Sequence, residues 1–139
     1  MMVLETSVIV EIFRPQPDPR VVSWLESLTG EVATTSVTVA EVLDGVRHLR
    51  SSRGRATLST RIRSTLQLYR DTRSVLAFDA EAARHYPEVL AARERVGLPI
   101  SMADAQIASI CRAHGAICAT RNTRNFDHTG VALFNPWAL

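Results

Sequence analysis

Residues 2–9 read Met-Val-Leu-Glu-Thr-Ser-Val-Ile, and the pattern of this stretch recurs along the chain. A short apolar run ends in one acid, Glu5, and a helix is then predicted to begin near Thr6 and to end before Pro15. Further short strands alternate with predicted helices of roughly ten to fifteen residues, which indicates βαβ crossovers and a parallel sheet covered on both faces. The predicted fold class is therefore α/β.

The later elements follow from hydrophobic periodicity and from the positions of glycine and proline. We expect first a helix ending at Gly30, a strand over 32–35 and a helix carrying Glu41, then a loop from Ser51 to Gly54 and an arginine-rich helix to about Asp71. A strand over 75–78 is expected next, followed by a helix capped by Asp79 and ending at Gly97. The last predicted elements are a helix from Ser101 to Gly115 and strands over 116–120 and 131–134. A kink or break is expected at Pro87, because proline lacks a backbone donor and clashes one turn back.

Composition is that of an ordinary globular protein. The chain has 139 residues, of which 46% are hydrophobic and 22% charged, so we expect one domain over residues 1–139. No apolar stretch approaches the ~18 residues that a membrane helix needs, and the first residues lack the features of a signal peptide, so a cytoplasmic location without a membrane partner is expected. Cys111 and Cys118 are predicted to be buried free thiols, and the four histidines show no zinc-ligand spacing.

Arginine use narrows the possible functions. All sixteen basic residues are arginine, and the absence of lysine argues against Walker-type phosphate loops and against receiver or haloacid-dehalogenase domains. The chain also lacks a G-x-G-x-x-G turn, so a dinucleotide site is not predicted. Half of the arginines fall within residues 47–73, where the only acid is Asp71; this run is either a solvated helical face or a phosphate-binding surface.

Three carboxylates occupy similar positions. Glu5 ends the first strand, while Glu41 and Asp104 lie near the starts of helices, so all three are expected at the carboxyl edge of the sheet, where ligands bind in such folds. Together they predict a divalent-cation site in an enzyme acting on phosphate. The spacings from Thr38 to Glu41 and from Ser101 to Asp104 also fit a capping box, a structural alternative for both acids. Glu5 shows no such spacing, and a lone carboxylate there is costly to bury without a partner or cation.

Four motifs resemble those of a known family. They are Val3-Leu-Glu-Thr-Ser-Val-Ile9, Thr38-Val-Ala-Glu-Val42, Ser101-Met-Ala-Asp-Ala-Gln-Ile-Ala108 and Ala119-Thr-Arg-Asn-Thr-Arg-Asn-Phe126, followed by Asn135-Pro-Trp137. In this order and spacing the chain resembles a PIN domain of the VapC-type toxin branch over almost its whole length. The resemblance implies a three-layer α/β/α sandwich around a parallel sheet of roughly five strands, and magnesium- or manganese-dependent cleavage of RNA by the toxin of a toxin–antitoxin pair.

The resemblance also implies roles for individual residues. Glu5 and Asp104 would bind Mg²⁺ or Mn²⁺, directly or through water, and Glu41 would be a further ligand or the base that orients the attacking water. The family usually has Asp where this chain has Glu5, and the extra methylene moves the carboxylate by roughly 1.5 Å, which predicts impaired catalysis. A fourth acidic position of the family falls at Asn122, with Asp127 the nearest remaining acid.

Partners are likewise implied by the resemblance. They are an RNA substrate, a cognate antitoxin that covers the acidic groove, and a second copy that forms a homodimer. Arg121 and Arg124, beside the expected site, are candidate phosphate contacts, with ordinary surface charge as the alternative. A catalytically silent PIN-fold module that binds RNA or a protein is an alternative function, favoured by Glu5 and Asn122; DNA cleavage is a third.

Overall fold

The protein is described here from a computed structural model, which covers residues 1–49 and 53–139. Its elements are β1 (Met2–Leu4), α1 (Thr6–Ile12), α2 (Pro19–Ser27), β2 (Val32–Thr35), α3 (Ser36–Arg47), α4 (Arg53–Asp71), β3 (Val75–Leu76), α5 (Ala80–Arg95), α6 (Met102–His114), β4 (Ile117–Ala119), α7 (Thr123–Phe126), β5 (Ala132–Phe134) and a 3-10 turn, η1 (Pro136–Ala138). The loop predicted from Ser51 to Gly54 lies partly outside the described residues, and its last two residues belong to α4.

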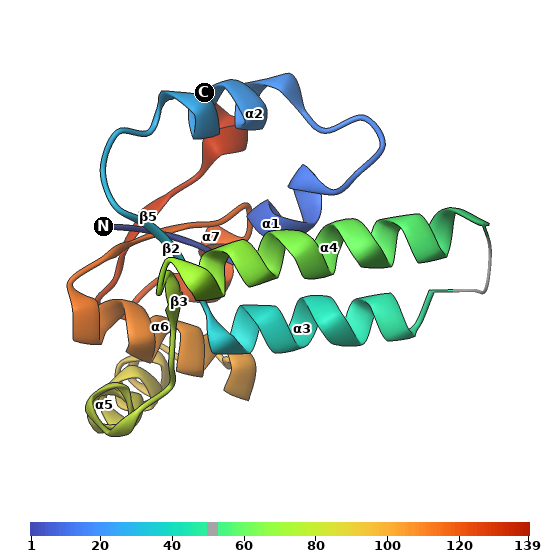
Figure 1. The fold of residues 1–139 in the computed structure, drawn as a ribbon. Helices are drawn as coiled ribbons and strands as arrows, with labels where there is room; N and C mark the ends of the chain where they lie inside the picture. Colours follow the sequence, from blue (N-terminus) through green and yellow to red (C-terminus); the bar gives the residue numbers. More distant parts are fainter. Residues whose placement is uncertain (50–52) are drawn as a thin grey trace.

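The five strands form one parallel sheet in the order β3-β2-β1-β4-β5. β1 is central, with Val3 opposite Ala33 of β2 and Cys118 of β4. In Figure 1, α3 and α4 run side by side in opposite directions on one side of the sheet, and α5 and α6 pack together on the other. The α/β/α sandwich with a five-stranded parallel sheet is therefore confirmed.

Each face of the sheet is covered by its own hydrophobic cluster. Successive side chains of a strand point to opposite faces, so Leu4 packs in the cluster with α1, α2, α3 and α4, while Val3 packs with α5 and α6. Both residues are fully buried, and burial of such side chains contributes roughly 1.5–3 kcal/mol each. The short β1 strand is thus fixed from both sides, and it holds the backbone of the following residue, Glu5, in place.

Some local predictions were wrong. β2 has the predicted bounds, but the other four strands are one or two residues shorter than expected. The break expected at Pro87 is absent, since α5 runs without interruption from Ala80 to Arg95. Pro87 and Ala83, the residue one turn before it, are both accessible at the helix surface, so water can satisfy the carbonyl that proline leaves without a donor. The short elements α7 and η1 were not predicted, because four or fewer residues carry no readable periodicity.

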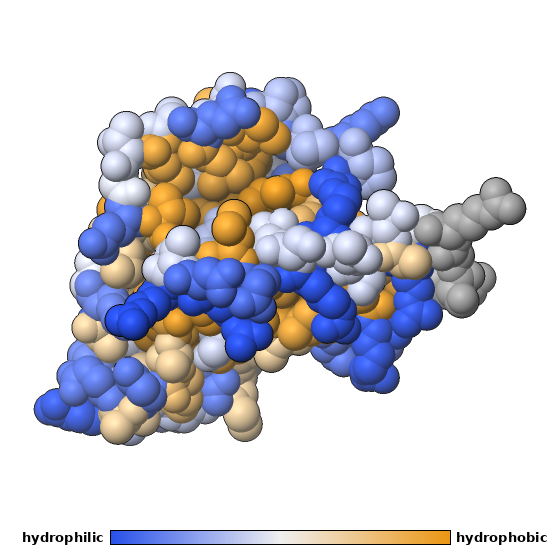
Figure 2. Space-filling view, in the orientation of Figure 1, coloured by the Kyte–Doolittle hydropathy of each residue, from blue (hydrophilic) through white to orange (hydrophobic). Residues whose placement is uncertain are grey.

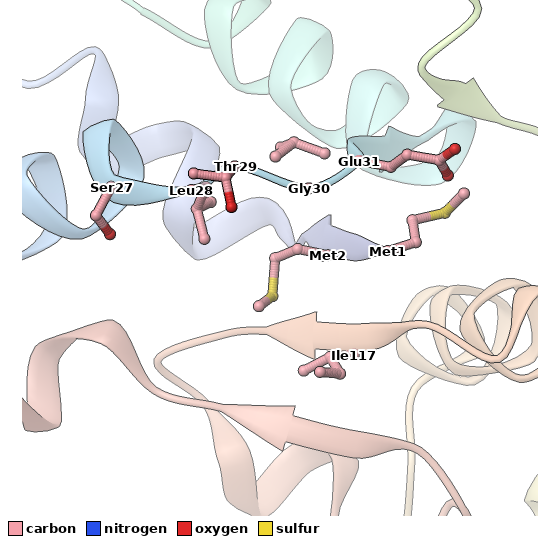
Figure 3. A pocket seen from close by; sticks show the side chains of 9 residues that line it. Met1, Met2, Ser27, Leu28, Thr29, Gly30, Glu31 and Ile117 are labelled. Carbon is pink, nitrogen blue, oxygen red and sulfur yellow. The ribbon is translucent and has the colours of Figure 1, made fainter.

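The two edges of the sheet differ in chemistry. At the amino edge a hollow of about 270 Å³ lies between the starts of β1 and β4 and the 27–31 loop, and its one carboxylate is Glu31 (Figure 3). The three acids singled out from the sequence follow strands or begin helices, and they lie toward the opposite, carboxyl edge. Among the described helices, none is both long and apolar enough to cross a membrane.

Candidate active site

Glu5 lies directly after β1 and is buried, with 5% of its surface exposed. Its Oε2 accepts hydrogen bonds from the Ser7 backbone N–H at 3.0 Å, the Ser7 hydroxyl at 2.6 Å and the Thr120 hydroxyl at 2.8 Å. Glu5 is therefore the N-cap of α1, and the expectation that it has no capping role was wrong. Its side chain is long enough to turn back onto the residue two positions on, and these donors offset the cost of burying the carboxylate.

Glu41 lies in the second turn of α3 and is exposed. Its Oε1 accepts a hydrogen bond of 2.7 Å from the hydroxyl of Thr6, which is the first residue of α1. The predicted capping box from Thr38 to Glu41 is wrong, because α3 begins earlier and Thr35 is its N-cap, accepting from the Thr38 N–H at 2.9 Å. Since Glu41 is not used as a cap, its carboxylate is available to a ligand.

Asp104 lies in the first turn of α6 and is partly buried. The Ser101 hydroxyl caps this helix as predicted, accepting from the Asp104 N–H at 3.1 Å. Burial raises the pKa of the Asp104 carboxyl, and the negative charges of Glu5 and Glu41 raise it further, whereas Ser101 and Arg93 lower it. Two acids that are far from Asp104 in sequence therefore act on its carboxyl group electrostatically.

This arrangement fits a hard divalent cation with few direct protein ligands. Within the described residues, no three His, Cys, Asp or Glu side chains come close enough to hold a metal between them. Mg²⁺ keeps several waters and usually takes only one or two carboxylates, so two acids with a third nearby are sufficient. Burial and the negative charges of Glu5 and Glu41 destabilise the ionised form of Asp104, and a bound cation relieves such destabilisation.

The fourth acidic position of the sequence motif is occupied by an amide. Asn122 precedes α7, and its N–H donates to the Thr120 hydroxyl at 3.0 Å. The same hydroxyl donates to Glu5, so Thr120 connects Asn122 to that acid. Asp127 follows α7 on its other side, and its charge is not among those that shift the pKa of Asp104. Of the two predicted candidates, Asn122 is therefore the one connected to the acids.

The two predicted phosphate contacts differ in how they are held. The Arg121 N–H donates to the Ser7 hydroxyl at 3.0 Å, while its guanidinium lies over the Trp137 ring, 5.3 Å from the centroid. This cation–π contact places the Arg121 side chain toward the C-terminal turn. Arg124 is exposed on α7, and its carbonyl accepts from Arg93. Both backbones lie at the rim of the acidic site, and both residues are exposed at the surface.

Arg93 is a buried residue near Asp104 that the sequence did not indicate. Only 4% of it is exposed, and its guanidinium donates to the carbonyls of Arg124 at 3.0 Å, Asp127 at 2.8 Å and Pro99 at 2.6 Å. It therefore ties α7 to the segment before α6. Arg93 and Asp104 also line one hollow of about 410 Å³. Arg93 is one of three arginines in α5, and nothing in the sequence distinguishes it from Arg84 and Arg95.

The cysteine prediction is confirmed, since Cys111 of α6 and Cys118 of β4 are free and buried. A hydrogen bond with Cys111 is the main cause that raises the pKa of the Cys118 thiol, with burial second. A thiol held protonated in this way is a poor nucleophile and a poor metal ligand. The pair belongs to the core beneath the acids.

Comparisons with known proteins agree with this architecture. A family model described as PIN domain matches residues 2–132. The chain is 39% identical to Toxin FitB of Neisseria gonorrhoeae over 139 residues, covering 99% of each protein, and 34% identical to VapC ribonuclease Y4jK of Sinorhizobium fredii over 138 residues, covering 99% of this chain and 98% of the relative. It superimposes with a TM-score of 0.92 on a chain from the solved structure of FitAB bound to IR36 DNA fragment, at 38% identity, over 100% of this chain and 97% of that one.

Proposed function

Because this chain belongs to the PIN domain family, in its VapC-type toxin branch, we propose that it is a divalent-metal-dependent endoribonuclease and the toxin of a toxin–antitoxin pair. The observation that carries this proposal is that Glu5, Glu41 and Asp104 follow a strand or begin helices at the carboxyl edge of one sheet, where the charges of Glu5 and Glu41 add to burial in raising the pKa of Asp104. The names of the two relatives, a toxin and a ribonuclease, support the same reaction and setting.

Glu5 and Asp104 would hold Mg²⁺ or Mn²⁺, and both offer the hard oxygen ligands that these ions prefer. When bound, the cation would lower the pKa of a coordinated water and offset negative charge on the reacting phosphate. Glu41 is exposed and accepts a hydrogen bond from the Thr6 hydroxyl, and its carboxylate would orient the attacking water and accept its proton. Asn122 can donate or accept hydrogen bonds but adds no negative charge at this edge.

Glu5 supports a second candidate function, a catalytically silent module that binds RNA or a protein. Within the described part of the chain, the three hydrogen bonds of its carboxylate all go to Oε2, so one carboxylate oxygen already has three donors. An oxygen that already accepts three hydrogen bonds is a weaker ligand for a cation. Displacement of the carboxylate by one methylene also lowers the rate of the reaction. We therefore propose that the natural activity is lower than that of a variant with aspartate at this position.

An antitoxin and a second copy of the chain are the proposed protein partners. The chain superimposes on part of a complex named FitAB, and an apolar hollow of about 330 Å³ lies beside Glu41 between α1, α3 and α4. Phe13, Val46 and Ile62 are among its lining residues. A segment of the antitoxin bound in this hollow would cover the acids. It would also bury apolar surface, and the hydrophobic effect favours such burial by roughly 25 cal/mol per Å².

Cleavage of total cellular RNA tests the proposal. The purified chain and its Glu5→Asp and Glu5→Ala variants are incubated with RNA in Mn²⁺ and, separately, in EDTA. We expect cleavage only with Mn²⁺, fastest for Glu5→Asp and slowest for Glu5→Ala. Retention of RNA without cleavage by both the natural chain and Glu5→Asp would instead support the silent module. Identical cleavage by the two variants would contradict the role given to Glu5.

A further inference from the structure

A further concave surface lies at the start of α3, away from the acids. It is a hollow of about 520 Å³ lined by Ser36, Val39, Arg70, Arg73 and Val75. Ser36 and Val39 belong to the first turns of α3, whereas the two arginines come from the end of α4 and the residues after it. The hollow therefore combines two cationic side chains with one hydroxyl and two apolar side chains.

Within the described residues, five arginines pair with a carboxylate, whereas the two at this hollow do not. Arg47 pairs with Asp44 at 2.9 Å, and Arg84 pairs with Glu81 at 3.2 Å. Arg70 and Arg73 are exposed, and within residues 1–49 and 53–139 neither guanidinium takes part in an ion pair or a hydrogen bond. Two uncompensated guanidinium groups at one hollow are suited to bind a phosphate with paired N–H donors.

The backbone at Arg73 gives a second, independent reason. Its φ of 56° is in the left-handed region, and α4 ends there with the Ser74 N–H donating to the Tyr69 carbonyl at 2.8 Å and the Arg73 N–H to the Arg70 carbonyl at 3.0 Å. Glycine is the usual residue at this position of such a helix end, because any other residue costs roughly 1–2 kcal/mol in this conformation. Arginine therefore stands where stability alone favours glycine.

The hollow and the acidic site share the start of α3. Thr38 and Glu41 are three positions apart and face Thr6, while Ser36 and Val39, also three apart, line the hollow. At 3.6 residues per turn the two pairs lie on roughly opposite sides of the helix, whose diameter with side chains is about 10–12 Å. Stacked nucleotides advance about 3.4 Å each along a strand, so a few nucleotides span this distance.

We propose that this hollow binds a backbone phosphate of the RNA substrate, about three nucleotides from the bond that is cut. The inference rests on the proposed function and adds a second, remote contact to it. Figure 2 shows hydrophilic side chains along α4, beside a hydrophobic area between α4 and α2. Only a substrate long enough to pass over the start of α3 reaches both places.

Binding of a single-stranded ten-nucleotide RNA in EDTA tests this inference without requiring cleavage. The variants are Arg70→Gln and Arg73→Gly, and the matched control is Arg84→Gln, which removes a charge on α5. We expect Kd to rise roughly tenfold for each of the first two and to stay unchanged for the control. The dependence of log Kd on log salt should weaken by about 0.7 for each phosphate that the protein no longer neutralises. A dinucleotide should bind the natural chain and the variants equally.

Thermal unfolding of the same variants separates binding from structure. Arg73→Gly should unfold at the same or a higher temperature while binding RNA more weakly, since it removes both the strain and the guanidinium. Equal RNA affinity in Arg70→Gln, Arg73→Gly and Arg84→Gln would overturn the inference, whether or not the chain cuts RNA. So would a loss of affinity seen only with duplex DNA, because that result would assign the hollow to DNA.

Discussion

The junction of β1 with α1 and the first turn of α6 each present one acid to the same site, and the protein treats these two acids differently. Glu5 has three hydrogen-bond donors on a single oxygen. Asp104 is left with a raised pKa, caused by burial and by the charge of Glu5. The chain itself therefore stabilises one carboxylate and leaves the other in need of a cation.

Asp104→Asn should have the largest effect on activity. The change keeps the size of the side chain but removes the charge that would hold the metal, and charge stabilisation by a bound metal is worth several kcal/mol. Cleavage of RNA in Mn²⁺ should fall on the order of a thousandfold. Asp127→Asn serves as the control and should keep full activity. If Asp104→Asn and Asp127→Asn lose equal amounts of activity, the specific role of Asp104 in binding the metal is contradicted.

Glu41→Gln should reduce kcat by on the order of a hundredfold, because the amide cannot accept a proton from the attacking water. The affinity for RNA should change little, since Thr6 can still donate to the amide oxygen. Single-turnover kinetics on a short RNA measure both quantities. A rise in KM at constant kcat would contradict a role for Glu41 in the reaction and favour one in binding.

Glu5→Asp should raise activity by roughly tenfold to a hundredfold, because the shorter side chain cannot satisfy Ser7 and Thr120 in the same way and leaves its oxygens freer for the cation. Stability in EDTA should fall for the same reason. Rates and melting temperatures of the two proteins, measured side by side, test this exchange. If the rate and the melting temperature of Glu5→Asp both rise, the higher activity does not come from the loss of these hydrogen bonds.

Thr120→Val should destabilise the fold by about 2 kcal/mol, because it removes a buried donor to a charged acceptor. Thr34→Val is the matched control: that hydroxyl is equally buried but donates to the neutral carbonyl of Leu4 at 2.8 Å, so its loss should cost less. Chemical denaturation of both variants gives the comparison. A smaller loss at Thr120 than at Thr34 would show that Glu5 gains little from this donor.

The smallest expected effect is on the pH dependence of stability without metal. The raised pKa of Asp104 means that the folded protein holds this proton more tightly than the unfolded chain, whose carboxyl titrates near about 3.9. This contribution is complete below that value and is lost as pH rises through the folded pKa. The melting temperature of the natural chain in EDTA should therefore fall relative to Asp104→Asn over that range. If the melting temperatures of the two proteins change with pH in parallel, the raised pKa of Asp104 is contradicted.

The sequence was sufficient for the order of strands and helices, because β1, β2 and α6 have clear apolar periods and Ser101 and Gly115 are strong helix boundaries. It was not sufficient for the start of α3. Thr34, Thr35, Ser36 and Thr38 are all possible caps, and the pairing of β2 with β3, which extends to Thr35 opposite Leu76, fixes where the strand ends and α3 begins. The contacts of Arg93 with Asp127 and of Glu5 with Thr120 join residues more than thirty positions apart, which local pattern cannot reveal.

A cation bound beside Asp104 would be seen in the shift of melting temperature that Mn²⁺ produces in the natural chain, in Asp104→Asn and in Asp127→Asn. If a cation relieves the repulsion around Asp104, then Mn²⁺ should raise the melting temperature of the natural chain and of Asp127→Asn by several degrees and leave that of Asp104→Asn unchanged. An equal rise in all three proteins would place the cation elsewhere and contradict a metal site at these acids.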